Sequence, residues 1–328
     1  MAESPILLLT GATGFVGHAL FERLRGEYPL RVLLRDPRGS LPQDLQPLPG
    51  MSVADVQLLP GDLSTTLPAL PPVDVVVHCA ARVHVMQEHD SDPLAAFRRV
   101  NVEGTRALAR RAVEAGARRF VFLSSIKVNG EATAPGRPFT ADDPPAPGDP
   151  YGLSKYEAEQ ALLQLGRETG LEIVIVRPVL VYGPGVKANF RRLLGWLKRG
   201  IPLPLGALDN RRSLLALDNL VDLLALCIHH PAAANHVFLA SDGEDLSTPE
   251  LLRRLGAALG RPARLWSLPP AWLSVAGRLL GRSAEVERLC GSLQVDSRAT
   301  RERLNWQPPV AVDAALAATA RDFLENVR

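Results

Sequence analysis

The chain has 328 residues, of which 46% are hydrophobic and 22% are charged, with 37 basic and 35 acidic side chains and a formal net charge of +2. This balance is typical of a globular protein with a substantial core, and it excludes an intrinsically disordered chain. The basic residues are scattered rather than gathered in a stripe, so nucleic acid is not expected as a partner.

Up to residue 178, short β-type runs alternate with helical periods. The runs are apolar on both faces, which is typical of buried strands in a parallel sheet, and they lie at 5–10, 30–35, 56–60, 73–80, 118–125 and 171–178. Helical periods lie between them at 15–25, 92–116 and 152–169. This alternation predicts right-handed crossovers and an α/β fold with a doubly wound parallel sheet.

The pattern changes after Pro178 and indicates a second, smaller α/β domain. A loop-rich stretch at 182–213 is followed by a helix predicted at 249–259, which opens with a capping box, and by a C-terminal helix after Pro308 and Pro309. We therefore expect a first domain at 1–178 and a second at 179–328, with some later segments packing back on the first.

The cysteines and apolar runs bear on compartment and membrane insertion. The three cysteines are far apart, which argues against a disulfide framework or a zinc site and favours a reducing, cytoplasmic location. The N-terminal apolar run is too short for a signal peptide, and the run at 265–280 is broken by prolines and a glycine. No membrane span is predicted.

A glycine-rich turn follows the first predicted strand and opens the first helix. Its glycines allow a tight turn, a close approach of the backbone to a pyrophosphate and close packing of helix on strand. A plain tight turn is the alternative, but strand, helix and spacing all favour a dinucleotide site. The predicted cofactor contacts of this turn are Gly11, Thr13, Gly14, Phe15, Val16 and Gly17.

The end of the second strand bears on the choice of cofactor. Arg35 and Asp36 both stand where the adenosine ribose is expected. An arginine pairs with the 2′-phosphate of NADP, whereas an aspartate binds the free hydroxyl of NAD. Because the predicted strand runs directly into Arg35, NADP(H) is favoured and NAD(H) is the alternative.

Further cofactor contacts are expected where later strands end. An aspartate after the third strand can bind the adenine amino group, or simply serve the turn, and small residues after the fourth strand let backbone pass close to the cofactor. Asn101 follows on a helix and can bind main chain near the nicotinamide, although a surface asparagine is the alternative. Together with strand-end residues further on, these contacts are Asp62, Leu63, Ala80, Ala81, Asn101, Ser124 and Pro178.

A tyrosine and a lysine four residues apart, Tyr151 and Lys155, open the helix predicted at 152–169. The chain has 33 arginines but only four lysines and four tyrosines, so this spacing is not expected by chance. The two side chains stand one turn apart on one helix face, and an ammonium there is expected to lower the pKa of the tyrosine toward a range useful in acid–base catalysis. Ser125, at the end of the fifth strand, can bind the same substrate oxygen. The Pro-rich loop at 129–150 leads directly into Tyr151 and is interpreted as a substrate-side loop.

Taken together, the motifs TGATGFVG, GDL, AA, NVEGT, SS, YGLSK and RPVLVYGPG resemble those of extended short-chain dehydrogenases/reductases, in the nucleotide-sugar epimerase and dehydratase group. The resemblance covers nearly the whole chain. It implies a Rossmann domain, a C-terminal nucleotide-sugar domain and a catalytic triad of Ser125, Tyr151 and Lys155. It also implies a UDP-sugar substrate and a homodimer formed through the helices at 92–116 and 152–169.

Departures from the family pattern narrow the reaction. Where sugar dehydratases of this family carry an Asp-Glu pair, the chain has Ile126 and Lys127, so a dehydratase is not expected. Asn129 replaces the usual tyrosine of Val-Tyr-Gly, which changes the pocket above the nicotinamide. The resemblance further suggests substrate contacts at Lys127, Asn189, Arg212 and Arg288, of which Arg288 is equally compatible with a helix surface. The histidines show no metal-ligand spacing, so no metal is expected.

Three functions are compatible with these residues. The first is a 4-ketoreductase, suggested by Arg35 and the missing Asp-Glu pair. Its expected substrate, a UDP-linked 4-keto-6-deoxy hexosamine in the synthesis of surface polysaccharide such as the O-antigen of lipopolysaccharide, is implied only by overall resemblance to enzymes of O-antigen synthesis. The second is a UDP-glucose or UDP-N-acetylhexosamine 4-epimerase with tightly bound NAD. The third is a non-catalytic nucleotide-sensing protein, which the presence of both Tyr151 and Lys155 disfavours.

Overall fold

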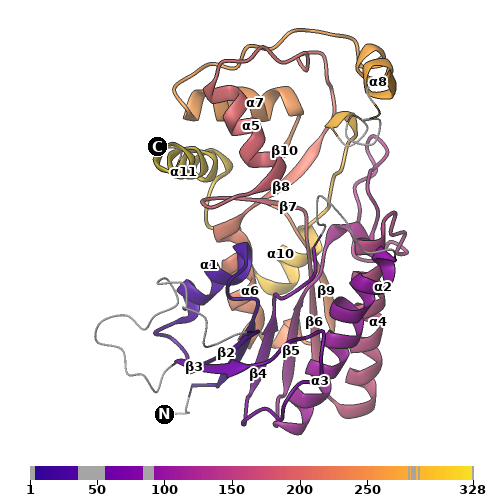
Figure 1. Cartoon of the computed structure of the whole chain (residues 1–328), viewed down its shortest axis with the longest axis vertical. Helices are drawn as coiled ribbons and strands as arrows, with labels where there is room; N and C mark the ends of the chain where they lie inside the picture. Colours follow the sequence, from indigo (N-terminus) through magenta and orange to yellow (C-terminus); the bar gives the residue numbers. More distant parts are fainter. Residues whose placement is uncertain are drawn as a thin grey trace.

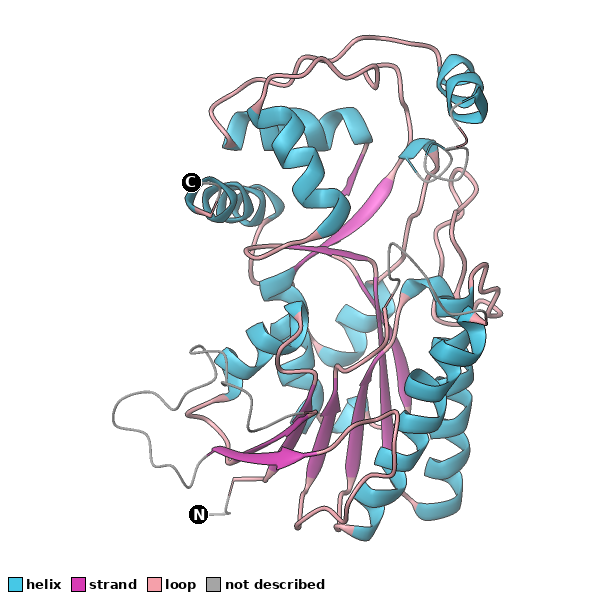
Figure 2. Ribbon diagram, viewed as in Figure 1, coloured by secondary structure: helices cyan, strands magenta, loops and turns pink. Residues whose placement is uncertain are grey.

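A seven-stranded parallel sheet with helices on both faces forms the larger part of the molecule (Figure 1, Figure 2). The computed structural model describes residues 4–35, 56–83, 92–279, 281, 286 and 289–326. The strand order β3-β2-β1-β4-β5-β6-β9 confirms the doubly wound sheet. All strands are parallel, and the order in which the chain adds strands reverses between β1 and β4. Its strands are β1 (Leu7–Thr10), β2 (Leu30–Leu34), β3 (Val56–Pro60), β4 (Val75–His78), β5 (Arg119–Leu123), β6 (Glu172–Pro178) and β9 (His236–Ala240).

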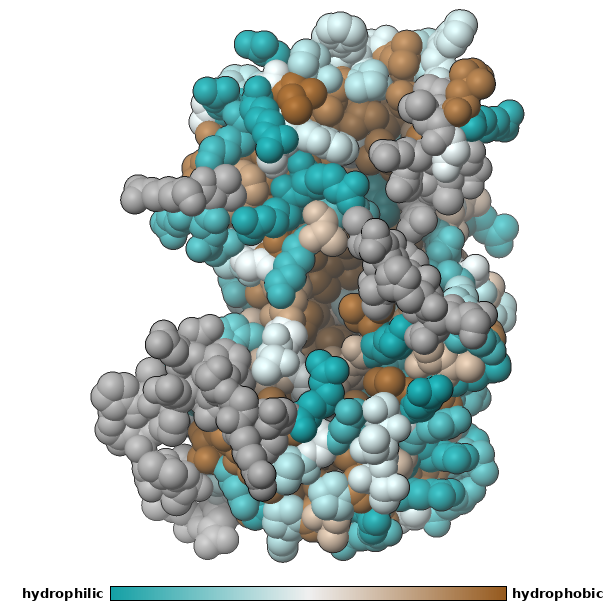
Figure 3. Space-filling model, viewed as in Figure 1, coloured by the Kyte–Doolittle hydropathy of each residue, from teal (hydrophilic) through white to brown (hydrophobic). Residues whose placement is uncertain are grey.

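A smaller sheet of order β10-β8-β7 forms the core of the second part, drawn at the top of Figure 1. Its elements are β7 (Leu180–Tyr182), α5 (Ala188–Lys198), β8 (Arg212–Ala216), β10 (Asp245–Leu246), α7 (Thr248–Ala258), α8 (Pro270–Leu279) and α11 (Val312–Glu325). The surface is hollowed between the two parts, with hydrophobic atoms on the floor of the hollow (Figure 3). This hollow lies beyond the carboxyl ends of the large sheet's strands, where ligands of such sheets bind.

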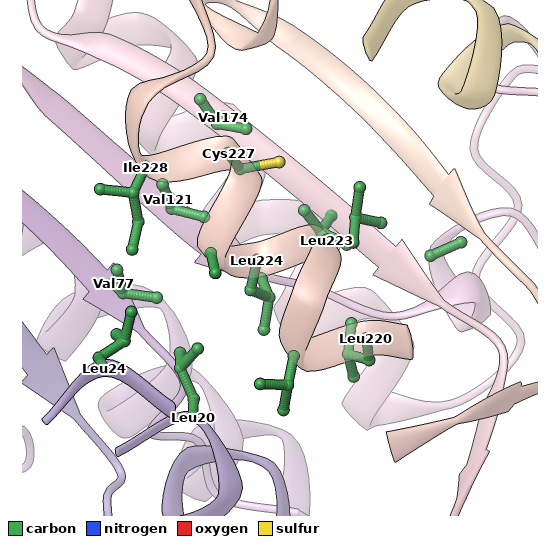
Figure 4. Packing of buried hydrophobic residues seen from close by; sticks show 14 of the residues in the cluster. Leu20, Leu24, Val77, Val121, Val174, Leu220, Leu223, Leu224, Cys227 and Ile228 are labelled. Carbon is green, nitrogen blue, oxygen red and sulfur yellow. The ribbon is translucent and has the colours of Figure 1, made fainter. Parts of the chain in front are cut away.

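Helices cover both faces of the large sheet. On one face lie α1 (Phe15–Leu24) and α6 (Leu217–His229); on the other lie α2 (Pro93–Arg98), α3 (Thr105–Glu114) and α4 (Pro150–Thr169). Figure 4 shows Leu224, Cys227 and Ile228 of α6 lying over the β-branched residues of the strands. The strands are mostly apolar, and successive residues point to opposite sides, so both faces of the sheet are apolar. Short helical turns are η4 (Ile126–Val128) and η5 (Pro231–Ala233), and α10 (Arg298–Leu304) packs near β9.

Segments beyond residue 178 also complete the large sheet. β9 pairs with β6 in parallel, with Val176 opposite Phe238, although β9 lies in the second half of the chain. Helix α6 then packs against α1 on the first half. The larger part of the molecule is therefore built from both halves of the sequence.

The helix predicted at 92–116 is divided. A π-helical segment, η3 (Arg99–Gly104), separates α2 from α3. A Cβ atom at Gly104 would lie 2.3 Å from the carbonyl oxygen of Leu63, so only glycine lets this segment approach the turn after β3. The same segment carries Asn101 with its side chain buried. Wide helical turns of this kind are frequent at functional sites.

Across the described ranges, none of the helices combines the length and apolarity that crossing a membrane requires.

Candidate functional site

The glycine-rich turn lies between β1 and α1, directly against the end of β4. Gly11 adopts a φ of 77°, and a Cβ atom there would lie 2.6 Å from the backbone nitrogen of Ala80. A Cβ at Gly17 would lie 2.1 Å from the carbonyl oxygen of Gly11. Both positions therefore exclude side chains, and Gly14, as the N-cap of α1, leaves the helix N-terminus open. Such an uncovered helix N-terminus suits a pyrophosphate.

The other residues of this turn differ in exposure. Thr13 is exposed, whereas Phe15 and Val16 are half-buried. The ring of Phe15 packs against the cores of both parts of the molecule. The turn therefore stands at the junction of the two parts.

At the ends of β2 and β3, Arg35 and Asp62 lie close enough to interact. Asp62 accepts hydrogen bonds from the backbone nitrogen and the hydroxyl of Ser64, both at 2.8 Å. These bonds lower the pKa of the Asp62 carboxyl, and the charge of Arg35 lowers it further. Leu63 is buried against Gly104. The Arg35 guanidinium is thus partly balanced by a carboxylate, while Asp36 lies outside the described residues.

Asn101 links the end of β4 to α4. Its Oδ1 accepts a hydrogen bond from the backbone nitrogen of Arg82 at 2.8 Å, and its Nδ2 donates to the Arg82 carbonyl at 3.0 Å. The same Nδ2 donates to the hydroxyl of Ser154 at 2.9 Å. These bonds hold the backbone that follows Ala80 and Ala81 against the helix that carries Tyr151 and Lys155.

Tyr151 and Lys155 lie in the first two turns of α4. The N-cap residue, Asp149, accepts a hydrogen bond from the backbone nitrogen of Gly152 at 2.7 Å. Tyr151 is half-buried, with its ring edge-on to Phe97 at 6.0 Å between centroids. Lys155 is 2% exposed, and its Nζ lies 4.1 Å from the centroid of Phe122, where a cation is attracted to the ring face.

The protonation of this pair differs from the sequence-based expectation. Burial, followed by the negative charge of Asp149, raises the pKa of Tyr151 to about 12. Burial lowers the pKa of Lys155 to about 7, against opposing contributions from Glu159 and Cys79. The predicted lowering of the tyrosine pKa is therefore wrong in this structure, because desolvation disfavours the charged form of both groups. Lys155 is consequently the member of the pair that titrates near neutral pH.

Ser125 and Ser124 follow β5 but have different partners. Ser125 is half-buried, and its hydroxyl oxygen accepts a hydrogen bond from the backbone nitrogen of Lys127 at 3.3 Å. Ser124 is buried and donates to Glu159 Oε1 at 2.5 Å. Ser125 is therefore the less buried of the two serines, while the hydroxyl of Ser124 is bonded within the protein.

Glu159 also forms a buried ion pair with Arg177 of β6, which precedes Pro178 at the strand end. The guanidinium donates from Nε to Glu159 Oε1 at 2.9 Å and from Nη2 to Oε2 at 2.5 Å. Its Nη1 donates to Asn129 Oδ1 at 3.0 Å, and Asn129 donates to the Thr140 carbonyl at 3.0 Å. A continuous chain of hydrogen bonds therefore joins α4 to the loop at 129–150.

His78 lies at the end of β4 beneath the site. Its ring nitrogens contact the hydroxyls of Thr10, at 2.6 Å, and Thr105, at 2.9 Å. Burial, together with the charge of Lys155, lowers the pKa of His78 to about 3. The imidazole is therefore neutral at physiological pH and adds no charge beside the lysine.

The predicted substrate contacts lie on separate elements. Lys127 forms ion pairs with Asp149 and, at 3.3 Å, with Glu131. Asn189 is exposed at the start of α5 and accepts a bond from Arg192 at 3.1 Å. Arg212 begins β8 and donates to the Gly291 carbonyl at 3.0 Å, while Arg288 lies outside the described residues. Over the part of the chain that is described, no cluster of His, Cys, Asp and Glu could hold a metal ion.

A family profile described as NAD dependent epimerase/dehydratase matches residues 7–240. The chain belongs to this family. The match spans the glycine turn, Ser125, Tyr151 and Lys155, and so confirms the family resemblance stated from the motifs. The structure of a UDP-glucuronic acid 4-epimerase from Bacillus cereus in complex with NAD has the same fold, with a TM-score of 0.78, 20% identity and coverage of 98% of this chain and all of that one.

Two curated relatives bear on the activity of this epimerase/dehydratase. A UDP-glucose 4-epimerase of Vibrio cholerae is 47% identical over 324 residues, covering 97% of this chain and 95% of that protein. An N-acetyl-α-D-glucosaminyl-diphospho-ditrans,octacis-undecaprenol 4-epimerase of Escherichia coli O157:H7 is 26% identical, covering 89% of this chain and 87% of that protein. The family acts on nucleotide sugars with a nicotinamide cofactor, as the motifs indicated.

Three residues that interact electrostatically with Tyr151 or Lys155 were not predicted from the sequence. Glu159 stands four residues after Lys155 in YGLSKYEAE, a helical spacing that could have drawn attention to it. Asp149 precedes a proline at a helix start, which is a capping signal. His78 carried no local signal, because its burial between two threonines depends on strands and helices far apart in the sequence.

Proposed function

We propose that this chain is a UDP-hexose 4-epimerase that interconverts UDP-glucose and UDP-galactose with bound NAD. The observation that carries the proposal is the 47% identity to the Vibrio cholerae UDP-glucose 4-epimerase over nearly the whole of both chains. The site supports it, because a half-buried tyrosine and a buried lysine stand one helical turn apart on α4, which packs against the short helix η4 capped by Ser125. The 4-epimerase is therefore our first hypothesis, and the 4-ketoreductase that the sequence favoured becomes the alternative.

The residues present fit the dinucleotide. The turn at Gly11, Gly14 and Gly17 leaves room for backbone and phosphate only, and the N-terminus of α1 opens onto it. When bound, NAD supplies a reversible hydride acceptor for carbon 4 of the sugar. Because the Asp62 carboxylate lies near Arg35, a 2′-phosphate at this strand end would meet a negative charge, which favours NAD over the NADP expected from sequence.

The chain's own residues would manage the proton at the sugar 4-oxygen. Tyr151 is protonated at neutral pH, which suits the return of a proton to that oxygen when the product hydroxyl is re-formed. In the opposite direction the phenolate is needed, so epimerisation should become faster as the pH rises. Ser125 would hold the same oxygen, and the buried Lys155 would hold the nearby hydroxyls of the cofactor.

The test is to incubate the purified protein with UDP-glucose and to measure UDP-galactose by anion-exchange chromatography, together with total oxidised and reduced nucleotide. We expect interconversion without net consumption of cofactor, and NAD among the nucleotides released on denaturation. Tyr151→Phe should lower the rate by about 10² to 10⁴-fold. The control Tyr156→Phe, five residues further along α4, should leave the rate unchanged. Oxidation of NADPH with a UDP-4-keto sugar, without epimerisation, would establish the reductase instead.

A second candidate substrate is a sugar diphosphate carried on a polyprenol, as named for the Escherichia coli relative. It is favoured by one feature of the second domain, the group of exposed large apolar side chains between residues 266 and 279. The same assay with a short-chain polyprenyl-diphosphate N-acetylglucosamine separates the two substrates. We further propose that two copies associate through α3 and α4, which pack side by side on the sheet face away from α1.

A further inference from the structure

Large apolar side chains are exposed in an unusual concentration along residues 266–279. Of the eight large hydrophobic residues that are exposed in the described part of the chain, four lie in this short stretch. They are Trp266 at 66%, Trp272 at 64%, Val275 at 46% and Leu279 at 83% exposed. We call this group, with the exposed arginines Arg261, Arg264 and Arg278 around it, the α8 surface.

Helix α8 presents these residues on one side. Trp272, Val275 and Leu279 are spaced by three and four residues, so they fall on the same helical face. Leu273, on another side of the helix, is buried in the core of the second domain. The helix is thus anchored by one apolar residue while its apolar face points to solvent.

Trp266 projects from a backbone that is held in place. Its nitrogen donates to the Leu203 carbonyl at 2.9 Å, and its carbonyl accepts from the Gly206 nitrogen at 2.7 Å. The exposure of the indole is therefore a property of an ordered segment whose main chain is paired. Tryptophan is enriched where a protein meets the boundary between lipid and water, because its ring is apolar and its N–H is polar.

Residues 251–284 are basic in sequence, and among their arginines Arg254 of α7 forms ion pairs with Glu244, Glu250 and Asp313. From Leu251 to Ala284 the sequence contains six arginines and no aspartate or glutamate. Three of these arginines, at 261, 264 and 278, are exposed beside the apolar residues. Such a combination of an apolar helical face, tryptophan and basic residues is typical of helices that lie on anionic membranes.

The α8 surface lies at the end of the molecule opposite the large sheet. Figure 1 places α8 at the top, far from α3 and the N-terminal strands, and Figure 3 shows hydrophobic atoms along this end. The second domain, rather than the cofactor-binding part, would therefore face whatever binds there.

We propose that the α8 surface docks the protein on an anionic lipid bilayer. The apolar face of α8 and the two indoles enter the boundary between headgroups and acyl chains, and the arginines contact lipid phosphates. Docking brings the second domain to the membrane surface, where a polyprenol-linked sugar would be presented. Membrane docking rests on the proposal of a polyprenol-linked substrate made above. Vesicle binding is measured without any sugar, so a failure to bind vesicles and a failure to act on the polyprenol-linked sugar are separate results.

The experiment is flotation of the full-length protein with vesicles of phosphatidylcholine containing phosphatidylglycerol and cardiolipin, against vesicles of phosphatidylcholine alone. We expect the protein to float with the anionic vesicles and to be released by high salt, which screens the arginines. Brominated acyl chains should quench tryptophan fluorescence in the bound state. Absence of flotation with anionic vesicles at low salt would overturn the proposal.

Variants assign the binding to this surface. Trp272→Ser with Leu279→Ser should weaken binding about tenfold or more, and Arg264→Gln and Arg278→Gln should weaken it about fivefold each. The matched controls are Leu324→Ser on α11 and Arg23→Gln on α1 with Arg303→Gln on α10, all exposed positions elsewhere, which should bind as the unaltered protein does. All of these residues are exposed, so circular dichroism should report unchanged folding.

Two outcomes would contradict the membrane assignment. If the apolar and arginine variants float as well as the unaltered protein, another surface binds lipid. If sedimentation shows a dimer that Trp272→Ser with Leu279→Ser dissociates, and flotation is absent, the α8 surface contacts a second copy of the chain instead.

Discussion

Lys155 shows how burial alters the chemistry of a single residue. Its ammonium lies against the ring of Phe122 with 2% of the side chain exposed. Glu159, one helical turn further on, favours the charged form, but desolvation outweighs it and lowers the lysine pKa to about 7. Tyr151 responds to the same surroundings in the opposite direction, because its charged form is the anion.

The first prediction concerns the pH dependence of stability. An unfolded lysine titrates near 10.4, so between about pH 7 and 10 the unfolded chain holds more protons at this position than the folded one, and stability rises with pH. Lys155→Met removes this contribution. The variant should therefore be more stable than the unaltered protein at pH 6, and the difference should shrink toward pH 10.

Thermal unfolding of nucleotide-free protein across this pH range measures the effect. Lys198→Met, on α5, serves as the control for loss of a lysine elsewhere. A difference between Lys155→Met and the unaltered protein that stays constant from pH 6 to 10 would contradict the assignment of the titration to Lys155.

At the scale of elements, α4 is joined to the sheet by charge as well as by packing. Tyr151, Lys155 and Glu159 recur at intervals of four residues, so they share one side of the helix. The Glu159–Arg177 pair then ties that side to β6, with 1% of the Glu159 side chain and 5% of the Arg177 side chain exposed. The same guanidinium reaches Asn129 and hence the loop at 129–150. The asparagine that departs from the family motif therefore has a structural role in this link.

The second prediction tests this link. Glu159→Gln leaves the charge of Arg177 buried without its carboxylate, which should cost about 3–5 kcal/mol of unfolding free energy. Adding Arg177→Met should restore part of the lost unfolding free energy, because the double variant no longer buries an unpaired guanidinium. Urea denaturation measures both.

The control is Glu172→Gln, which removes a carboxylate that is 36% exposed and bound to Arg119. Arg119 keeps its bonds to the carbonyls of Cys227 and His230, so we expect a change of under about 1 kcal/mol. Equal losses in Glu159→Gln and Glu172→Gln would show that burial of the pair is not what matters.

For the whole molecule, Asp242 joins the two sheets. It follows β9 of the large sheet, and its carboxylate accepts bonds from the Ala216 nitrogen at 2.9 Å, Asn219 Nδ2 at 2.7 Å and the Tyr182 hydroxyl at 3.0 Å. Tyr182 and Ala216 belong to β7 and β8 of the small sheet. One half-buried carboxylate therefore connects the end of the large sheet with two strands of the small sheet.

The third prediction is that Asp242→Asn destabilises the protein. The carboxylate accepts bonds from Tyr182, Ala216 and Asn219, and in the variant an amide nitrogen replaces one of its two acceptor oxygens. At least one buried donor then lacks an acceptor, which should lower the free energy of unfolding by about 1–3 kcal/mol. Asp296→Asn, which removes a surface pair with the exposed Arg298, should change stability by under about 1 kcal/mol. Chemical denaturation compares the two, and a smaller loss for Asp242→Asn than for Asp296→Asn would contradict the role given to Asp242.

Local signals determined much of this protein from sequence alone. The alternation of apolar runs and helical periods predicted the parallel sheet, because strand and helix periodicities are local properties. The glycine turn and the Tyr151–Lys155 spacing were also readable, since each depends on neighbours within one turn of helix or chain. The division of the helix at 92–116 was not, because it depends on Gly104 meeting Leu63 from a separate segment.

The tertiary structure decided everything that depends on desolvation and on distant partners. The sequence placed a lysine beside a tyrosine and implied that its charge would act on the phenol. Only the fold buries that lysine against Phe122, surrounds His78 with two threonines and brings Arg177 to Glu159. Charge states in a protein interior follow from the removal of water, and which groups lose their water is determined by packing between segments that are far apart along the chain.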